Sequence, residues 1–211
     1  SSPSSLGFSA QENEKGLFKS ALVNITNKPS DVTTANILTA AWSLVLARRL
    51  STTDAIFGAV TSGRNIDSLA NAQTIMGPCY QFTPIRVSLS TSLDTATLLR
   101  SIATQVAESS SHDFVGHSAI ARAVGWDVES GFDSLVHHQD DEDDVDTMPF
   151  AGGICRVDLV KPHGDSPRPF KVVSFVKGGE TFVGVVGAER EEAVIGEVLG
   201  ELVDAVGEIL G

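Results

Sequence analysis

Two adjacent histidines, His137 and His138, are the residues of this sequence that most invite a catalytic interpretation. Histidine acts as a general acid or base near neutral pH, and in a His-His-x-x-x-Asp-Gly pattern the second histidine serves the attacking nucleophile. Here the sixth and seventh positions are Glu142 and Asp143, so the glycine that permits a sharp turn is missing. We therefore interpret the pair as polar residues at the end of a strand, and we expect no catalytic residue in this chain.

The acidic run that follows the histidines does not match a metal site. Counted from Asp141, a calcium loop of the EF-hand type needs an oxygen ligand at its fifth position and glycine at its sixth, where this sequence has Val145 and Asp146. His112 and His117 lie five residues apart without two further ligands nearby, which argues against zinc. The sequence also contains no Gly-rich phosphate loop and no Gly-x-Ser-x-Gly elbow. We expect no metal and no cofactor bound directly by the chain.

The negative charge of the chain is concentrated in one segment. The formal net charge is −12, and the stretch 127–146 holds nine acidic residues and neither lysine nor arginine. The rest of the chain holds the other 18 of the 27 acidic residues and all 15 basic ones, so its net charge is only −3. Such a chain should be repelled by nucleic acid and by anionic membrane surfaces. We expect its partners to be proteins or small molecules, and residues 140–148 to form a mobile acidic loop.

The composition is that of an ordinary globular domain. Apolar residues make up 42% and charged residues 20% of a chain long enough to bury a core of its own. No run of 18 apolar residues is present that would span a membrane. The two cysteines, Cys79 and Cys155, do not make a disulfide framework, which favours a reducing, cytoplasmic location.

Hydrophobic periodicity predicts a mixed α/β protein. Residues 1–20 are expected to be a linker or lead-in, and residues 21–211 the folded domain. A strand series that interleaves with helices and leads to a closing helix favours a mixed-sheet α/β sandwich. The two glycines at 178 and 179 indicate a hairpin between the last two strands. The helices are predicted at 33–49, 94–109, 118–124 and from about 191 onward, and the strands at 55–61, 81–89, 132–138, 156–160, 171–176 and 181–186.

Four segments in order resemble the condensation domains of nonribosomal peptide synthetases. The segment 33–47, TTANILTAAWSLVLA, is similar to the helix that opens the C-terminal lobe of that family. The segment 54–64 is similar to its D-V-V-F-G … S-G-R strand, and 75–86 to its fifth core motif, with Gln-Phe in place of Asn-Thr. The segment 132–139, FDSLVHHQ, resembles the fungal motif F-N-S-I-V-Q-H-Q, so that its histidines belong to this late motif.

The resemblance implies one lobe of a two-lobed fold. Condensation domains consist of two chloramphenicol-acetyltransferase-like lobes with a tunnel between them, and the catalytic His-His-x-x-x-Asp-Gly lies in the N-terminal lobe, before this sequence begins. The implied partners are that N-terminal lobe and the carrier proteins, whose phosphopantetheine arms bring the acyl groups as thioesters. The reaction would be amide or ester formation or macrocyclising release, in a fungal synthetase that makes cyclic peptides, cyclodepsipeptides or siderophores.

The resemblance also assigns expected roles to individual residues. A floor loop is expected near 65–77, and the acidic segment 140–149 is expected to be a latch to the other lobe or its approach. An arginine, Arg86 or Arg64, either pairs with the Asp of the absent motif or makes a framework salt bridge. Tyr80 or Phe82 should be exposed beside the tunnel, on a face that promotes self-association. The tunnel and motif candidates are Arg64, Gly77, Tyr80, Phe82, Arg86, His138 and Gln139.

Two functions stay open at this point. The chain is either part of an acyltransferase, inactive when isolated, or a noncatalytic module that docks carrier proteins or its partner lobe. A free-standing acyltransferase of the same superfamily is disfavoured, because the chain has no complete His-His-x-x-x-Asp-Gly motif.

Overall fold

A six-stranded mixed sheet forms the centre of the computed structural model, which describes residues 3–6, 15–64, 69–89, 94–127, 131–139, 147–156 and 170–211. β4 lies in the middle and pairs in parallel with β2 on one side and β7 on the other, and the remaining pairs are antiparallel. This arrangement confirms the predicted α/β class. The strands follow one another in the order β1 (Gly16–Val23), β8 (Glu180–Ala188), β7 (Phe170–Lys177), β4 (Ser134–Gln139), β2 (Asp54–Thr61) and β3 (Gln81–Ser88).

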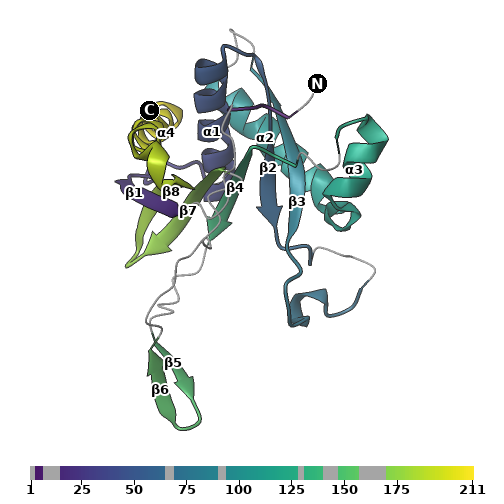
Figure 1. Cartoon of the computed structure of the whole chain (residues 1–211), viewed down its shortest axis with the longest axis vertical. Coiled ribbons are helices and arrows are strands. Elements are labelled where there is room, and N and C mark those ends of the chain that lie inside the picture. The colour runs from purple at the N-terminus through teal and green to yellow at the C-terminus, as the bar shows by residue number, and fades with distance from the viewer. Residues whose placement is uncertain are drawn as a thin grey trace.

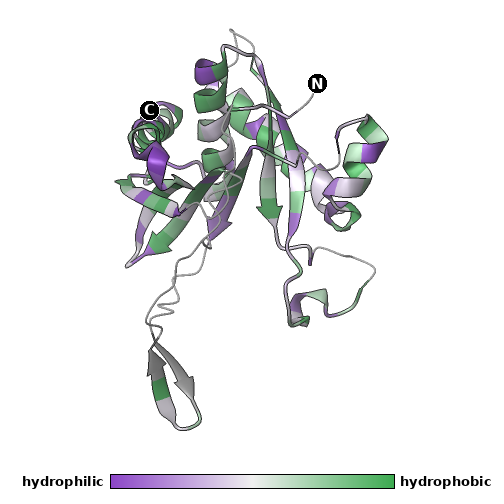
Figure 2. Cartoon of the chain, viewed as in Figure 1, coloured by the Kyte–Doolittle hydropathy of each residue, from purple (hydrophilic) through white to green (hydrophobic). Residues whose placement is uncertain are grey.

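Helices α1 (Thr34–Leu50), α2 (Thr95–Ser110) and α4 (Glu192–Leu210) contribute to one hydrophobic core with the sheet. α1 is the central helix, and most of its side chains are buried because it is apolar on nearly every side. Its first turn is capped by the hydroxyl of Thr33, which accepts a hydrogen bond from the Asn36 N–H at 3.1 Å. Figure 2 shows hydrophobic residues recurring along α1, α4 and the strands.

The C-terminal end of α1 is also joined to the middle of α4 by an ion pair. The Nε of Arg49 donates to Glu201 at 2.7 Å, and its Nη2 reaches the same carboxylate at 2.9 Å. A bidentate pair of this kind fixes the register of two packed helices more than it stabilises them, because it lies near the surface.

The predicted hairpin and all four predicted helices are confirmed. Lys177 pairs with Glu180 across Gly178 and Gly179, and both glycines have positive φ angles, 59° and 77°. A two-residue turn of this type requires residues that tolerate positive φ. The fourth predicted helix is α3 (His117–Val124), which lies beyond the β3 edge of the sheet in Figure 1.

Two features were not predicted from the sequence. β1 crosses the boundary expected between residues 20 and 21, and it pairs with β8 over its whole length. β5 (Thr147–Phe150) and β6 (Gly153–Arg156) form a separate two-stranded hairpin, drawn apart from the main sheet in Figure 1. Of the strand predicted at 156–160, Arg156 ends β6, and residues 157–160 lie outside the described residues.

The N-terminal segment 3–6 also contacts the sheet. Ser4 donates its N–H to the carbonyl of Ile56 at 2.7 Å, and its hydroxyl accepts the Ile56 N–H at 2.8 Å. Ser4 thus binds the backbone groups of Ile56, which comes before Gly58, the first residue of β2 that pairs with β4. Within the part of the chain that the structure describes, no helix is long and apolar enough to cross a membrane.

Candidate functional site

The sheet splits between β2 and β4, and this split forms the candidate site. The two strands pair only at Gly58–Leu135 and Ala59–Val136. Beyond these residues β2 continues with β3 as far as Thr61, whereas β4 continues with β7 as far as Gln139. Figure 1 shows the two strands diverging toward their C-terminal ends. The C-terminal ends of parallel strands at such a divergence are a common position for ligand sites in α/β proteins.

A cavity of about 410 Å³ occupies the split. Its walls come from the ends of β2 and β4, from β3, from the first turns of α1 and from the last turn of α2. The lining is mixed, and its polar side chains include Asn36, Thr39, Thr61, Thr83, Asp113 and His138. A cavity of this size and mixed polarity suits one small organic group.

His138 is the one sequence-predicted site residue that lines this cavity among the described residues. It is half-buried on β4, and its Nδ1 lies 2.6 Å from the hydroxyl of Ser174 on the neighbouring strand β7. This hydrogen bond fixes the ring orientation. Gln139, the next residue, alternates to the other face of the sheet and does not line the cavity.

A chain of hydroxyl groups ends on a buried carboxylate on the other side of the cavity. Thr83 is buried on β3 and donates to Asp113 Oδ1 at 3.2 Å. The hydroxyl of Thr61 on β2 lies 3.3 Å from that of Thr83. Asp113 is 5% exposed and belongs to the short 3-10 turn after α2. A carboxylate so deeply buried is uncommon unless it is hydrogen-bonded, as it is here.

Sequence analysis missed Asp113, Thr61 and Thr83. Asp113 lies between His112 and His117, whose spacing argued only against a zinc site, and the two threonines belong to no motif. The available signal was the alternation of β3, which places Thr83, Ile85 and Val87 on the buried face.

Arg64 organises the loop that follows β2. Its guanidinium donates to the carbonyls of Ile75, at 3.1 Å, and Gly77, at 2.9 Å. Arginine is suited to this because its donors diverge in a fixed plane. Gly63 immediately before it has a φ of +61°, and a Cβ there would lie 1.9 Å from the carbonyl oxygen of Cys79. The two ends of the loop are therefore held close together; residues 65–68 lie outside the described part.

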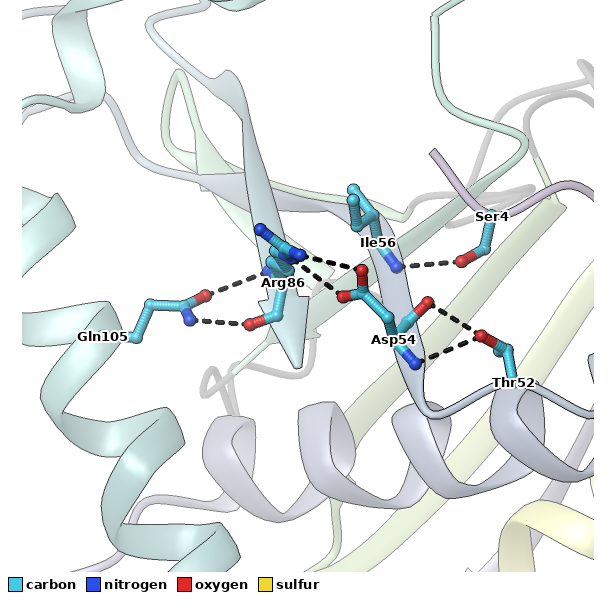
Figure 3. A network of polar contacts seen from close by, with 6 residues as sticks. All are labelled: Ser4, Thr52, Asp54, Ile56, Arg86 and Gln105. Carbon is cyan, nitrogen blue, oxygen red and sulfur yellow. Dashed lines mark hydrogen bonds and ion pairs between the residues drawn. The ribbon is translucent and has the colours of Figure 1, made fainter. Parts of the chain in front are cut away.

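Arg86 pairs within the chain (Figure 3). Its Nε and Nη2 donate to the two oxygens of Asp54 on β2 at 2.8 and 2.9 Å. This hydrogen-bonded ion pair raises the pKa of Arg86 above its ordinary value. The backbone of the same residue is bound by Gln105 of α2, which accepts its N–H and donates to its carbonyl, so that α2 covers part of the open edge of β3. Arg86 thus makes a salt bridge within this chain, and Arg64 binds two backbone carbonyls. That either arginine also pairs with the Asp of the absent motif stays a prediction.

The residues expected beside a tunnel are exposed, as predicted. Tyr80 is 56% exposed and Phe82 is 38% exposed, and their ring centroids lie 5.7 Å apart. Gly77, with a φ of +121°, and Met76, which is 96% exposed, extend this apolar surface along the loop. Of the segment expected to be mobile (140–148) and to form or approach a latch (140–149), residues 140–146 lie outside the described residues, and residues 147–149 belong to strand β5 rather than to a loop.

We expect this face to cause weak self-association. Phe82→Asp should abolish it, because a charged side chain cannot be buried in an apolar contact without a partner. Sedimentation velocity over a concentration series measures the effect, and Leu22→Asp, at an apolar residue of β1 that is 52% exposed, is the matched control. A wild-type chain that stays monomeric at the highest concentration would contradict this prediction.

His137 should make the fold sensitive to acid. Burial lowers its pKa below the ordinary value, and the nearby charges of His138 and Lys171 lower it further. The unfolded chain therefore takes up a proton at about pH 6.5, where the folded chain does not, so the free energy of unfolding should fall as the pH drops below about 6.5. The fall ends at the lower pKa of the folded state. Urea unfolding at about pH 8 and pH 5.5 should show a larger loss for the wild type than for His137→Gln, and equal losses would refute the assignment.

Comparison with known proteins identifies the family. Residues 12–143 match the Condensation domain family. Nonribosomal peptide synthetase sidD from Aspergillus fumigatus is 53% identical over 206 residues, which cover 97% of this chain and 10% of that protein. Nonribosomal peptide synthetase 6 from Cochliobolus heterostrophus is 39% identical over 191 residues, 89% of this chain and 11% of that protein. The chain thus spans about a tenth of these relatives.

Solved structures show the same fold over half of their length. The crystal structure of CT has a TM-score of 0.75 at 22% identity, covering 92% of this chain and 44% of that chain. The starter condensation domain of rhizomide synthetase RzmA has a TM-score of 0.71 at 15% identity, covering 100% of this chain and 48% of that chain. These findings confirm the resemblance to fungal synthetases drawn from the sequence motifs. The chain belongs to the condensation domain family and is a fragment of such a domain from a nonribosomal peptide synthetase, with the fold of one half of it.

Proposed function

We propose that this chain is the C-terminal lobe of a synthetase condensation domain and forms one wall of the tunnel in which carrier-bound thioesters react. The observation that carries the proposal is the cavity at the split of the sheet, in a chain whose fold matches half of a condensation domain. The reaction is amide or ester formation, or macrocyclising release of a cyclic peptide, cyclodepsipeptide or siderophore. The cytosolic location expected from the two cysteines stays a prediction.

The chemistry assigned to this lobe is positioning. A thioester is already activated toward acyl transfer, so the main requirements are proximity of the two reactants and exclusion of water. The phosphopantetheine arms of the carrier proteins supply the thioesters, and the N-terminal lobe supplies the histidine motif. The lobe described here supplies cavity walls and the loop fixed by Arg64.

The contacts to the missing lobe are assigned to two segments. The loop 69–80 carries Met76 and Tyr80 with their side chains exposed, so it offers an apolar surface for a partner. The β5–β6 hairpin, which follows the acidic segment, is proposed as the latch. Ile154 on this hairpin is 76% exposed and would be covered by the other lobe.

A noncatalytic docking module is the second candidate. The exposed apolar surface around Met76 and Tyr80 favours it, since the same surface would bind a partner whether or not chemistry follows. The two candidates differ in one respect: only the acyltransferase lobe is needed for turnover by the intact domain.

The test compares two proteins. One is this chain alone, and the other is the two-lobed domain, in which the N-terminal lobe precedes this chain in one polypeptide. The assay follows product from two carrier-bound thioesters by intact-mass spectrometry. We expect no turnover by this chain alone and turnover by the two-lobed domain, lost when the chain is deleted. Turnover by the isolated chain that disappears in a folded His138→Ala variant would refute the division of roles, and an active domain without this chain would favour the docking module.

A further inference from the structure

Asn36 differs from the other polar residues that line the cavity, because its side chain makes no hydrogen bond to any described residue. It lies in the first turn of α1 and is 6% exposed. The hydroxyl of Thr33 binds its backbone N–H, but its side-chain amide neither donates nor accepts within the described part of the chain. The amide atoms are not sealed off either, so they face the open space that borders the residue, which is the cavity.

Each of the other polar side chains in the described lining has a hydrogen bond to another group of the chain. The hydroxyls of Thr39, Ser109 and Ser110 donate to carbonyls of their own helices. The hydroxyl of Ser62 accepts the backbone N–H of the second residue after it, at 3.3 Å. The remaining polar residues make the contacts given above, and they are Thr61, Thr83, Asp113 and His138. The amide of Asn36 is therefore the group of this lining that the fold leaves unused.

An asparagine at this position does not serve the helix that carries it. Asparagine is a poorer helix former than alanine, and a nearly buried amide without a partner costs free energy that an apolar side chain in its place would not. α1 is otherwise apolar on nearly every side. A residue that breaks the local rule in a helix of this kind is expected at a functional site. The unused amide therefore points to a ligand in the cavity.

The size and lining of the cavity indicate what that ligand carries. A water molecule takes about 30 Å³ in the liquid. The cavity, at about 410 Å³, therefore holds far more than the water that one amide would bind. The lining offers both functions, because Ser62 keeps its own hydrogen to donate, whereas Thr39 presents lone pairs. A cation can use only the acceptor of Asn36 and an anion only its donors, but a second amide uses both at once.

We infer that the cavity is a subsite for a neutral substrate side chain that ends in an amide-type group, with Asn36 as the specificity-determining residue that hydrogen-bonds it. The inference rests on the proposed function, because it takes the cavity to face the substrates. A primary carboxamide has a donor and an acceptor on the same edge, so it pairs with the Asn36 amide through two hydrogen bonds. A trans secondary amide has its N–H and C=O on opposite edges, so a peptide bond or the pantetheine arm makes only one of these bonds at a time.

The test follows the side-chain NH₂ resonances of Asn36 in this 211-residue chain by NMR. The probes are the Nα-acetyl N-methylamides of glutamine, homoleucine and lysine. Homoleucine replaces the carboxamide of glutamine with an isopropyl group of the same shape, and lysine replaces it with a cation. We expect the glutamine probe to shift the Asn36 NH₂ resonances and to bind at least about tenfold more tightly than either of the other two.

Asn36→Leu should remove the preference for the glutamine probe, because leucine keeps the shape of the side chain and removes its donors and its acceptor. Ser43→Ala is the matched control. Ser43 is buried two turns further along α1, and its hydroxyl donates to the carbonyl of Ala40, so its loss should leave the preference unchanged. Asn36→Ala, which folds even if leucine does not fit, should lose the preference as well.

Four results would each overturn the inference. They are equal binding of the glutamine and homoleucine probes, Asn36 NH₂ resonances that do not move, tighter binding of the lysine probe, and tighter binding of pantetheine. The proposed function is judged separately by turnover of the two-lobed domain. An active domain whose Asn36 amide ignores the glutamine probe refutes the subsite alone, and glutamine binding at Asn36 without any turnover refutes the acyltransferase role alone.

Discussion

Replacing Trp42 with alanine should lower the free energy of unfolding by about 3–5 kcal/mol. Trp42 is fully buried in the central helix α1, and its ring stacks on that of Phe170, with centroids 6.0 Å apart. The alanine variant would leave a large cavity between α1 and the sheet, since neighbouring side chains in a close-packed core relax only in part. Urea denaturation followed by circular dichroism measures the change.

The hydrogen bond of Trp42 can be separated from its packing. Its Nε1 donates to the hydroxyl of Ser134 on β4 at 3.1 Å, and both groups are buried. Trp42→Phe should cost less than Trp42→Ala, and a double-mutant cycle with Ser134→Ala should give a coupling of about 1 kcal/mol. A Trp42→Ala variant that unfolds at the wild-type urea concentration would show that the helix is not packed as described.

Gly63→Ala should destabilise the fold by about 2–4 kcal/mol and release the loop that Arg64 holds. The φ of +61° costs an alanine about 1 kcal/mol, and its Cβ would lie 1.9 Å from a backbone oxygen of Cys79, which cannot rotate away as a side chain would. The loop ends must therefore separate. Urea unfolding measures the loss, and amide chemical shifts at residues 75–77 report the release.

Gly200→Ala is the matched control for Gly63→Ala. Gly200 lies within α4, and a Cβ there meets nothing within 4 Å. Alanine is the better helix former, so this variant should gain about 0.5–1 kcal/mol. If the two alanine variants had the same stability, the backbone of Gly63 would not lie as close to the carbonyl of Cys79 as described.

Local patterns in the sequence predicted the elements because each pattern reflects the environment of a single segment. The apolar run around Trp42 predicted a buried helix, and the glycines at 178 and 179 predicted a hairpin turn. β1 was missed because it is an edge strand, half-buried, whose pairing with β8 joins residues 158 to 172 positions apart. Its stability comes from the backbone hydrogen bonds of β8, which no pattern in residues 16–23 records.

The sequence by itself determined the family, the α/β class and the absence of the His-His-x-x-x-Asp-Gly motif from this chain, because these depend on residue order alone. Only the tertiary structure decided the site. The cavity exists because β2 and β4 stop pairing after Ala59 and Val136, which brings Thr61, Thr83, Asp113 and His138 from four separate segments to one place. The hydrogen bonds between Thr61 and Thr83 and between Thr83 and Asp113 are contacts between these segments. Neither spacing nor composition determines such contacts, since they arise only when the whole sheet and its helices have packed.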